Sequence, residues 1–353
     1  MRIAIPKEIK TLEGRIALIP DAVADLVKQG HEVFVQQSAG DLSGYTDAAF
    51  SQVGATIVPD AKSVYDAGEM IVKVKEPQAA ELDLMRPDHV LFSYLHLAAN
   101  LPLMKALQQL GLTAVAFETV QSADGALPLL APMSDIAGRV AVQVGTQLLH
   151  SPQGGKGVLL GGVPAAPRGK VVILGAGMAG GNAALLAAGM GAEVVVFDRS
   201  RDKLASMRAL GANVTGLYPY AEALKTAVAQ ADLLIGAILI PGERAQHLVS
   251  ADMVKSMQAG SVIIDISVDQ GGCVETTRAT TYENPTFVWE GIVHFGVTNM
   301  PGAVPRSASQ ALSASLTQYV IRLAAADWEQ QADLAAGVNV KQGEIVYPAL
   351  KNL

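Results

Sequence analysis

Cysteine is nearly absent from this sequence of 353 residues, and Cys273 is its one cysteine. A single cysteine cannot form an intramolecular disulfide, and this one lies in no CxxC spacing typical of a metal site. The first residues include Pro6 and several charges, where a signal peptide needs an unbroken apolar stretch. We therefore predict a cytoplasmic protein without a disulfide framework.

Long apolar runs, aromatic residues and excess positive charge are also missing. Apolar runs such as residues 233–240 stop near eight residues, whereas a bilayer-spanning helix needs about eighteen or more. Aromatic residues make up 5%, and 26 Lys and Arg against 33 Asp and Glu give a net charge of -7. Because the apolar runs are short, we do not expect a membrane-spanning protein. Because the net charge is negative, no positive field attracts phosphate backbones, and we do not expect a nucleic-acid-binding protein.

What is present is a regular alternation of short apolar runs and amphipathic stretches. The pattern predicts helices over residues 21–29 and 101–110, among strands at residues 2–5, 33–36, 55–58, 70–74, 90–94 and 113–117. It continues in the second half with strands at residues 171–174, 193–197, 231–240 and 261–266. Strand and helix in turn indicate an α/β fold with parallel sheets and crossover helices.

A glycine-rich turn, Gly175-Ala-Gly177-Met-Ala-Gly180, follows the strand at residues 171–174 and precedes an Ala- and Leu-rich helix. The first glycine allows a tight turn, the second lets the backbone approach a pyrophosphate, and the third lets helix and strand pack closely. The helix N-terminus adds unpaired N–H groups for the phosphates. This predicts a dinucleotide site that includes Met178 and Ala179, although such a turn can also serve tight packing alone.

The strand after this turn ends at Asp198, eighteen residues after Gly180. A carboxylate at this distance can accept hydrogen bonds from both ribose hydroxyls and would repel the additional phosphate of NADP. We therefore predict NAD as the cofactor, a preference that the adjacent Arg199 could soften. A later strand leads to Asp269, beside Gly271 and Gly272, at the sheet edge where ligands bind in open α/β folds.

Three polar residues stand among apolar neighbours in the first half: Arg15, Lys75 and His96. If the strands preceding Lys75 and His96 are neighbours, their ends converge, and two cations with an imidazole suit a small anionic substrate. Lys73 shares the face of Lys75 on a regular strand and is an equally placed rival. Alternatively, Arg15 and Lys75 form surface ion pairs, and His96 is a hydrogen-bonded structural residue. Composition alone does not distinguish His96 from the other histidines, which are His31, His89, His150, His247 and His294.

Taken together, these segments resemble the alanine dehydrogenase and pyridine nucleotide transhydrogenase family over nearly the whole chain. The matching stretches are Arg15-Ile-Ala-Leu, Lys73-Val-Lys75-Glu-Pro, Leu95-His96-Leu-Ala-Ala, Phe117-Glu118-Thr-Val, Leu127-Pro-Leu-Leu-Ala-Pro-Met133-Ser134, the glycine fingerprint, Asp265-Ile-Ser-Val-Asp269-Gln-Gly-Gly272 and Asn299-Met300-Pro301. The Leu-His-Leu and Asp-Gln-Gly-Gly stretches are similar to the dehydrogenase rather than to the transhydrogenase subunit.

The resemblance implies reversible, NAD-dependent oxidative deamination of L-alanine to pyruvate and ammonia. It implies that Arg15 and Lys75 hold the substrate carboxylate, that His96 hydrogen-bonds or protonates the reacting oxygen, and that Asp269 is the acid/base for water and amine. It also implies a homo-hexamer. Residues at the family's cofactor-contacting positions are Ser134, Asp198, Lys203, Ile238, Leu239, Ile266, Ser267, Val268, Asp269, Arg278, Val297, Thr298, Asn299 and Met300.

The sequence departs from the family pattern at three places. Ala325-Ala326-Asp327 replaces an acid–histidine pair that binds metal in some members, so no metal is predicted. Pro219 occupies a cofactor-contacting serine position, and Tyr94 lies beside His96, where it can tune the substrate pocket. These differences put strict alanine specificity in question but leave the hydride chemistry intact.

From the resemblance we expect two doubly wound, Rossmann-like domains linked by long helices at residues 133–149 and from residue 307. An NAD-binding domain, residues 131–303, is inserted into a discontinuous substrate domain, residues 1–130 and 304–353. Two alternatives remain. One is a transhydrogenase-type dinucleotide-binding subunit without an amino-acid site, which would not need Arg15, Lys75, His96 and Asp269 together. The other is a dehydrogenase for another small amino or oxo acid.

Overall fold

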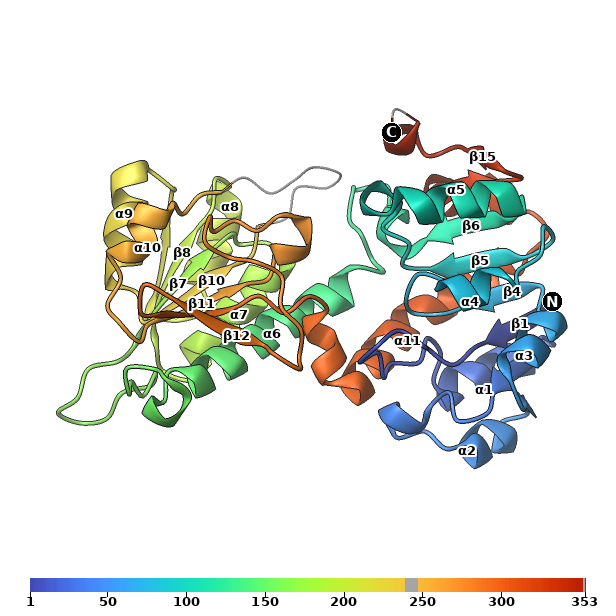
Figure 1. Ribbon diagram of the computed structural model, residues 1–353, viewed down its shortest axis with the longest axis horizontal. Coiled ribbons are helices and arrows are strands. Elements are labelled where there is room, and N and C mark those ends of the chain that lie inside the picture. The colour runs from blue at the N-terminus through green and yellow to red at the C-terminus, as the bar shows by residue number, and fades with distance from the viewer. Residues whose placement is uncertain (239–246, 352) are drawn as a thin grey trace. The chain divides into compact units, whose positions relative to one another are not determined.

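The structure, a computed structural model, describes residues 1–238, 247–351 and 353. The chain divides into two compact units, Met1–Met133 with Gly302–Leu353, and Ser134–Pro301. Each unit is built around one sheet (Figure 1). No helix in the part of the chain that the structure describes is long and apolar enough to cross a membrane.

The sheet of the first unit has the strand order β15-β14-β6-β5-β4-β1-β2-β3. Six strands form a parallel set, and β14 and β15 add an antiparallel edge. The strands are β1 (Arg2–Ile5), β2 (Glu32–Gln36), β3 (Thr56–Val58), β4 (Met70–Val72), β5 (Val90–Ser93), β6 (Thr113–Ala116), β14 (Val338–Lys341) and β15 (Glu344–Ile345).

Helices cover this sheet because the crossover connections carry apolar faces. They are α1 (Pro20–Lys28), α2 (Asp47–Gln52), α3 (Ala61–Ala67), α4 (Ala79–Leu82), α5 (Leu101–Leu110), α11 (Pro305–Leu323) and α12 (Ala332–Gly337). The α5 helix lies against β6 (Figure 1), and its buried Leu103 and Leu107 belong to the same core as Ala114. The Asn100 side chain caps its first turn, and Gly111 ends it in a left-handed conformation with φ 74°.

The sheet of the second unit has the order β12-β13-β11-β10-β7-β8-β9, parallel except for β12. Its strands are β7 (Lys170–Leu174), β8 (Glu193–Phe197), β9 (Val214–Leu217), β10 (Leu233–Gly236), β11 (Val262–Asp265), β12 (Thr286–Trp289) and β13 (Ile292–Phe295). The helices are α6 (Ala131–Leu148), in which the division between the units falls, α7 (Met178–Gly189), α8 (Arg201–Arg208), α9 (Ala221–Gln230) and α10 (Ala251–Lys255).

Both sheets reverse their strand order beside their first strand, between β1 and β4 and between β7 and β10. Ligands of open α/β sheets bind beyond the carboxyl ends of the strands near such a reversal. The predicted fold, two doubly wound α/β layers, is confirmed. Several strands are shorter than predicted, most of all β10, which covers Leu233–Gly236 instead of residues 231–240, of which 239 and 240 lie outside the described residues. Strand β4 ends at Val72 instead of residue 74, since the Val74 N–H bonds to the Glu8 carboxylate rather than to a neighbouring strand.

Candidate active site

Polar residues follow the ends of three neighbouring strands of the first unit. Lys75 follows β4, His96 follows β5 and Glu118 follows β6, and these strands pair in parallel in that order. Because parallel neighbours share an edge, the predicted segments of Lys75 and His96 come together at the carboxyl edge of the sheet. This edge is where chemistry in the first unit is expected.

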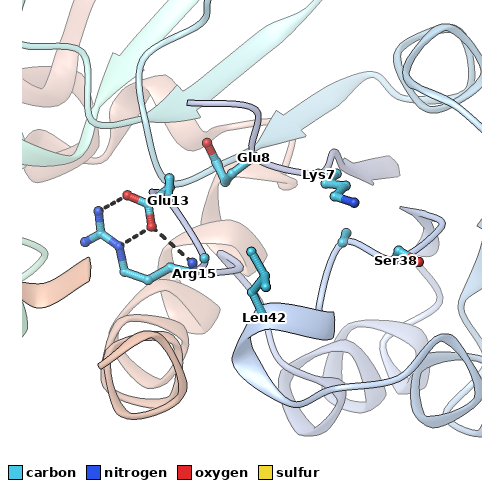
Figure 2. A pocket seen from close by; sticks show the side chains of 8 residues that line it. Lys7, Glu8, Glu13, Arg15, Ser38 and Leu42 are labelled. Atoms are coloured by element: carbon cyan, nitrogen blue, oxygen red, sulfur yellow. Dashed lines mark hydrogen bonds and ion pairs between the residues drawn. The ribbon is translucent and has the colours of Figure 1, made fainter. Parts of the chain in front are cut away.

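Arg15 is buried, and the Glu13 carboxylate holds it by two side-chain bonds. The Arg15 Nε donates to Glu13 Oε1 at 2.7 Å, and Nη2 donates to Glu13 Oε2 at 2.5 Å. The Arg15 backbone N–H also donates to Glu13 Oε1, at 3.0 Å. Figure 2 shows Glu13 beside the guanidinium, in a pocket that these residues line with Glu8 and Leu42. Burial alone would raise the pKa of Glu13, but the hydrogen bonds and charge of Arg15 outweigh it and lower this pKa.

The two lysines after β4 have different surroundings. Lys73 is 1% exposed and lies between two carboxylates, with Nζ 3.1 Å from Glu8 Oε2 and 3.1 Å from Glu81 Oε1. Lys75 is half-buried, and its pKa lies below the usual lysine value because of burial first and the charge of Arg15 second. Lys73 is therefore a structural ion-pair residue, which leaves Lys75 as the candidate for an anionic ligand.

Glu8, which the sequence reasoning missed, holds the peptide that carries Lys75. It is almost fully buried, and its Oε1 accepts the Val74 N–H at 2.5 Å. On the other side of this segment, Lys73 Nζ donates to the Lys75 carbonyl oxygen at 3.1 Å. Burial raises the pKa of Glu8 although Lys73 opposes the shift.

His96 has a left-handed backbone, φ 48° and ψ 42°, which is rare for a residue other than glycine. The Glu118 carboxylate supports this conformation by accepting the His96 N–H at 2.6 Å and the Leu95 N–H at 3.2 Å. The imidazole is 45% exposed and stacks on Tyr94, with ring centroids 5.9 Å apart. His89 and His294, in contrast, are buried and hydrogen-bonded, as structural histidines are.

The glycine turn of the second unit has the geometry that a dinucleotide requires. Gly175 has φ +96°, and a Cβ on Gly180 would lie 1.8 Å from the Gly175 carbonyl oxygen. A Cβ on Gly177 would meet nothing within 4 Å, and this residue begins α7 without a side-chain cap. The turn is therefore open toward solvent at the helix N-terminus, where a pyrophosphate binds in this motif, and it is closed where helix and strand pack.

Asp198 lies at the end of β8, next to this turn. Its Oδ2 accepts the Ala176 N–H at 2.8 Å, and its Oδ1 accepts the Ser200 N–H at 2.7 Å. The carboxylate thus lies where this motif places the acid expected to bind the ribose. Together with the glycine turn, it makes the described residues of the second unit fit a pyridine dinucleotide.

The other predicted cofactor contacts fall at several places in the second unit. Met178 and Ala179 form the first turn of α7, Ser134 is in α6 and Lys203 is in α8. Ile238, Ile266, Ser267, Val268 and residues 297–300 follow β10, β11 and β13 at one sheet edge, whereas Leu239 lies outside the described residues. Val297 and Met300 are 2% and 3% exposed, so their side chains pack inside the unit, and Arg278 is exposed over the Phe287 ring.

Asp269 is exposed in a short 3-10 helix, η5 (Val268–Gln270), directly beyond β11. Asp265, the last residue of β11, is in contrast fully buried, and burial raises its pKa to about 6. The two acids of this segment therefore differ, because one can reach a ligand and the other is enclosed. Within the part of the chain that the structure describes, no group of three or more His, Cys, Asp or Glu side chains could hold a metal ion.

Comparison with known proteins covers both units. The model of the alanine dehydrogenase/PNT N-terminal domain matches residues 4–137, and that of the C-terminal domain matches residues 141–348. Alanine dehydrogenase of Halomonas elongata is 46% identical over 356 residues, 99% of this chain and 96% of that protein. Alanine dehydrogenase of Bacillus subtilis is also 46% identical, over 99% of this chain and 94% of its own length.

Solved structures agree with these matches. An L-alanine dehydrogenase has a TM-score of 0.96 at 50% identity, covering 100% of this chain and 98% of that chain. A transhydrogenase from Sinorhizobium meliloti has a TM-score of 0.86 at 25% identity, covering 99% and 100%. The predicted resemblance is confirmed: this chain belongs to the alanine dehydrogenase/PNT family, whose Rossmann-like second domain binds a pyridine nucleotide.

Proposed function

We propose that this protein catalyses the reversible, NAD-dependent oxidation of L-alanine to pyruvate and ammonia. The observation that carries the proposal is that relatives named alanine dehydrogenase match 99% of the chain, through both units. A match limited to the second unit would support dinucleotide binding alone. We assign substrate binding to residues 1–130 with 304–353, and NAD binding to residues 131–303.

The charges around Arg15 suit a substrate with one carboxylate. Arg15 and Lys75 are two cations, Glu13 pairs with Arg15, and the charge of Arg15 contributes to the lowered pKa of Lys75. Substrate binding relieves the repulsion between the two cations, because a carboxylate placed between them is attracted to both. A guanidinium held by Glu13 and an ammonium together fix the direction of the carboxylate, and with it which face of Cα is presented to the nicotinamide.

The reaction consumes alanine, NAD⁺ and water and yields pyruvate, ammonium, NADH and one proton. The bound nicotinamide supplies the hydride acceptor for Cα. The ammonium group of alanine first releases a proton to solvent, so that the nitrogen lone pair can form an iminium as the hydride leaves Cα. Asp269 takes a proton from the water that adds to this iminium and returns it to the departing amine. His96 takes the proton of the new hydroxyl as the carbonyl forms, and it donates to this oxygen in the reverse direction.

The choice of nucleotide rests on Asp198. Asp198→Ala is expected to lower the ratio of kcat/KM with NAD to kcat/KM with NADP by about tenfold or more, because bonds from the ribose to a charged acceptor are lost. We use the ratio because Asp198 also accepts the Ala176 N–H, so that the loss of its carboxylate weakens the binding of both nucleotides. Asp202→Ala, at an exposed acid in α8, is the control, and an unchanged ratio in Asp198→Ala would remove Asp198 from ribose recognition.

The lowered pKa of Lys75 predicts a pH effect on substrate binding. As pH rises, Lys75 loses its charge before an ordinary lysine would, because burial and Arg15 both disfavour the ammonium. Pyruvate binding to the protein saturated with NADH, followed by nucleotide fluorescence, should therefore weaken with rising alkaline pH. Lys75→Arg keeps its charge and should lose most of this weakening; an identical pH profile in the variant would contradict the assignment.

The activity itself is tested by nicotinamide absorbance with a panel of amino acids and both nucleotides. We expect NADH formation with L-alanine and NAD, and much less with larger amino acids. Faster reaction with another small amino acid would favour the alternative of a different substrate. Nucleotide binding without oxidation of any amino acid would favour the transhydrogenase-type alternative.

We also propose a cytoplasmic homo-hexamer, on the basis of the family resemblance and the single, buried Cys273. Small-molecule substrates are its expected partners. Light scattering of the purified protein measures the assembly, and a monomeric or dimeric mass would contradict it.

A further inference from the structure

The candidate acid/base Asp269 sits on a loop that a buried carboxylate closes. Asp265, at the end of β11, accepts the Ser267 N–H at 3.0 Å with Oδ1, where the loop begins. Its Oδ2 accepts the Cys273 N–H at 2.9 Å and the Val274 N–H at 3.2 Å, where the loop returns. One side chain thus bonds to both ends of the segment that carries Asp269.

The space around this carboxylate is filled. Asp265 is 0% exposed, so it cannot touch a substrate. A Cβ on Gly236 of β10 would lie 2.9 Å from its Oδ1, and a Cβ on Gly272 would lie 2.8 Å from its Oδ2. The residues that carry the three backbone N–H groups, Ser267, Cys273 and Val274, are buried as well, so a lost acceptor would leave these groups unsatisfied.

A second contact ties the loop to the neighbouring strand. The Ser267 hydroxyl donates to the Ile238 carbonyl oxygen at 2.7 Å and accepts the Ile238 N–H at 3.0 Å. Ile238 follows β10, which pairs with β11. The start of the loop is therefore attached to two strand ends, through Asp265 and through its own serine.

We propose that Asp265 is a positioning residue whose carboxylate closes the loop of residues 267–273 and so fixes the backbone that presents Asp269. The inference rests on the proposed role of Asp269 as acid/base. Asp265 itself takes no part in proton transfer to substrate, because it is enclosed. Its effect on turnover acts through the backbone of this loop, and in the proton-transfer steps through Asp269.

Asp265→Asn tests the inference, because the amide nearly keeps the shape but turns an NH₂ group toward the backbone donors. Amide hydrogen exchange of the peptide spanning residues 266–274 should rise by about tenfold or more, while exchange in β7 and β8 stays unchanged. Cys273→Ala is the matched control: it removes the thiol 3.7 Å from Asp265 but retains the three backbone bonds, and its loop should stay protected.

Turnover supplies the second readout. Asp265→Asn should lower kcat for alanine by about tenfold or more, with an unchanged number of NADH sites per chain, which shows that the protein is folded. In the Asp269→Asn background, the same substitution should have no further effect on kcat, because residues that act through one group are not additive. If Asp265 acted independently of Asp269, the reductions in kcat of the two single variants would multiply in the double variant.

Unchanged loop exchange in Asp265→Asn, or losses that multiply in the double variant, would overturn the inference. If Asp265→Asn does not fold, Gly236→Ala replaces it, because its Cβ would lie 2.4 Å from Cys273 Sγ and 2.9 Å from Asp265 Oδ1 and so displace both partners of the loop closure, and the same two results are expected. If the wild-type protein does not oxidise alanine, the proposed function fails on its own. The exchange measurement then decides alone whether Asp265 holds the loop, and retained protection would refute it.

Discussion

Replacing His96 with alanine is expected to lower kcat for alanine oxidation by about a hundredfold or more, since general acid/base groups contribute about 10² to 10⁴ to the rate. The side chain is prepared for this role. It is exposed, it stacks on the Tyr94 ring, and the Glu118 carboxylate holds its left-handed backbone. Steady-state rates of NADH formation measure the effect.

Binding of NADH should stay within about threefold of wild type in this variant, because His96 belongs to the first unit, whereas the glycine turn belongs to the second. His150→Ala, at an exposed histidine, is the matched control and should retain full activity. A His96→Ala variant with a rate near that of wild type would remove the imidazole from the mechanism.

The second large effect is expected at Asp269. Asp269→Asn cannot take a proton from water or return one to the amine, so kcat should fall by about a hundredfold or more, in both directions of the reaction. The exposed position beyond β11 gives the carboxylate access to a ligand, which the enclosed Asp265 lacks. Rates of alanine oxidation and of pyruvate amination measure the loss.

Asp252→Asn, at a side chain that is 92% exposed in the same unit, controls for the loss of one negative charge. It should leave both rates unchanged. If Asp269→Asn retained wild-type rates, the acid/base role would pass to another group, and the loop that Asp265 closes would have no catalytic purpose.

Much of this fold could be predicted because its signals are local. Apolar runs of the right length marked ten of the fifteen described strands, all but β9, β12, β13, β14 and β15, and the glycine turn between β7 and α7 was found by its spacing. The position of Lys75 and His96 beyond strand ends was also readable. Their proximity at one edge followed once β4 and β5 proved to be neighbours.

The carboxylates that support the site could not be predicted, because their contacts are not local in sequence. Glu8 reaches the Val74 N–H across 66 positions, and Glu118 reaches His96 across 22. The position of Glu118 close behind the end of β6 was the one available signal for it. Nothing in the residue pattern distinguishes Glu8, three residues beyond β1, from the remaining acids of the chain.

The two lysines after β4 show the same limit. On a regular strand Lys73 and Lys75 share a face, so their residue types and spacing make them equivalent. The strand ends at Val72, and two carboxylates enclose Lys73 while Lys75 stays half-buried. Which lysine is free for a ligand is decided by Glu8 and Glu81, and therefore by tertiary structure.

Transfer of the Cα hydrogen of alanine is tested most directly by isotope labelling. The purified protein is incubated with NAD and L-alanine that carries deuterium at Cα, and the reduced nucleotide, pyruvate and ammonium are quantified. We predict equal amounts of the three products, with the deuterium in the reduced nucleotide. Absence of reduced nucleotide, or deuterium released to water instead, would contradict hydride transfer from alanine by this protein.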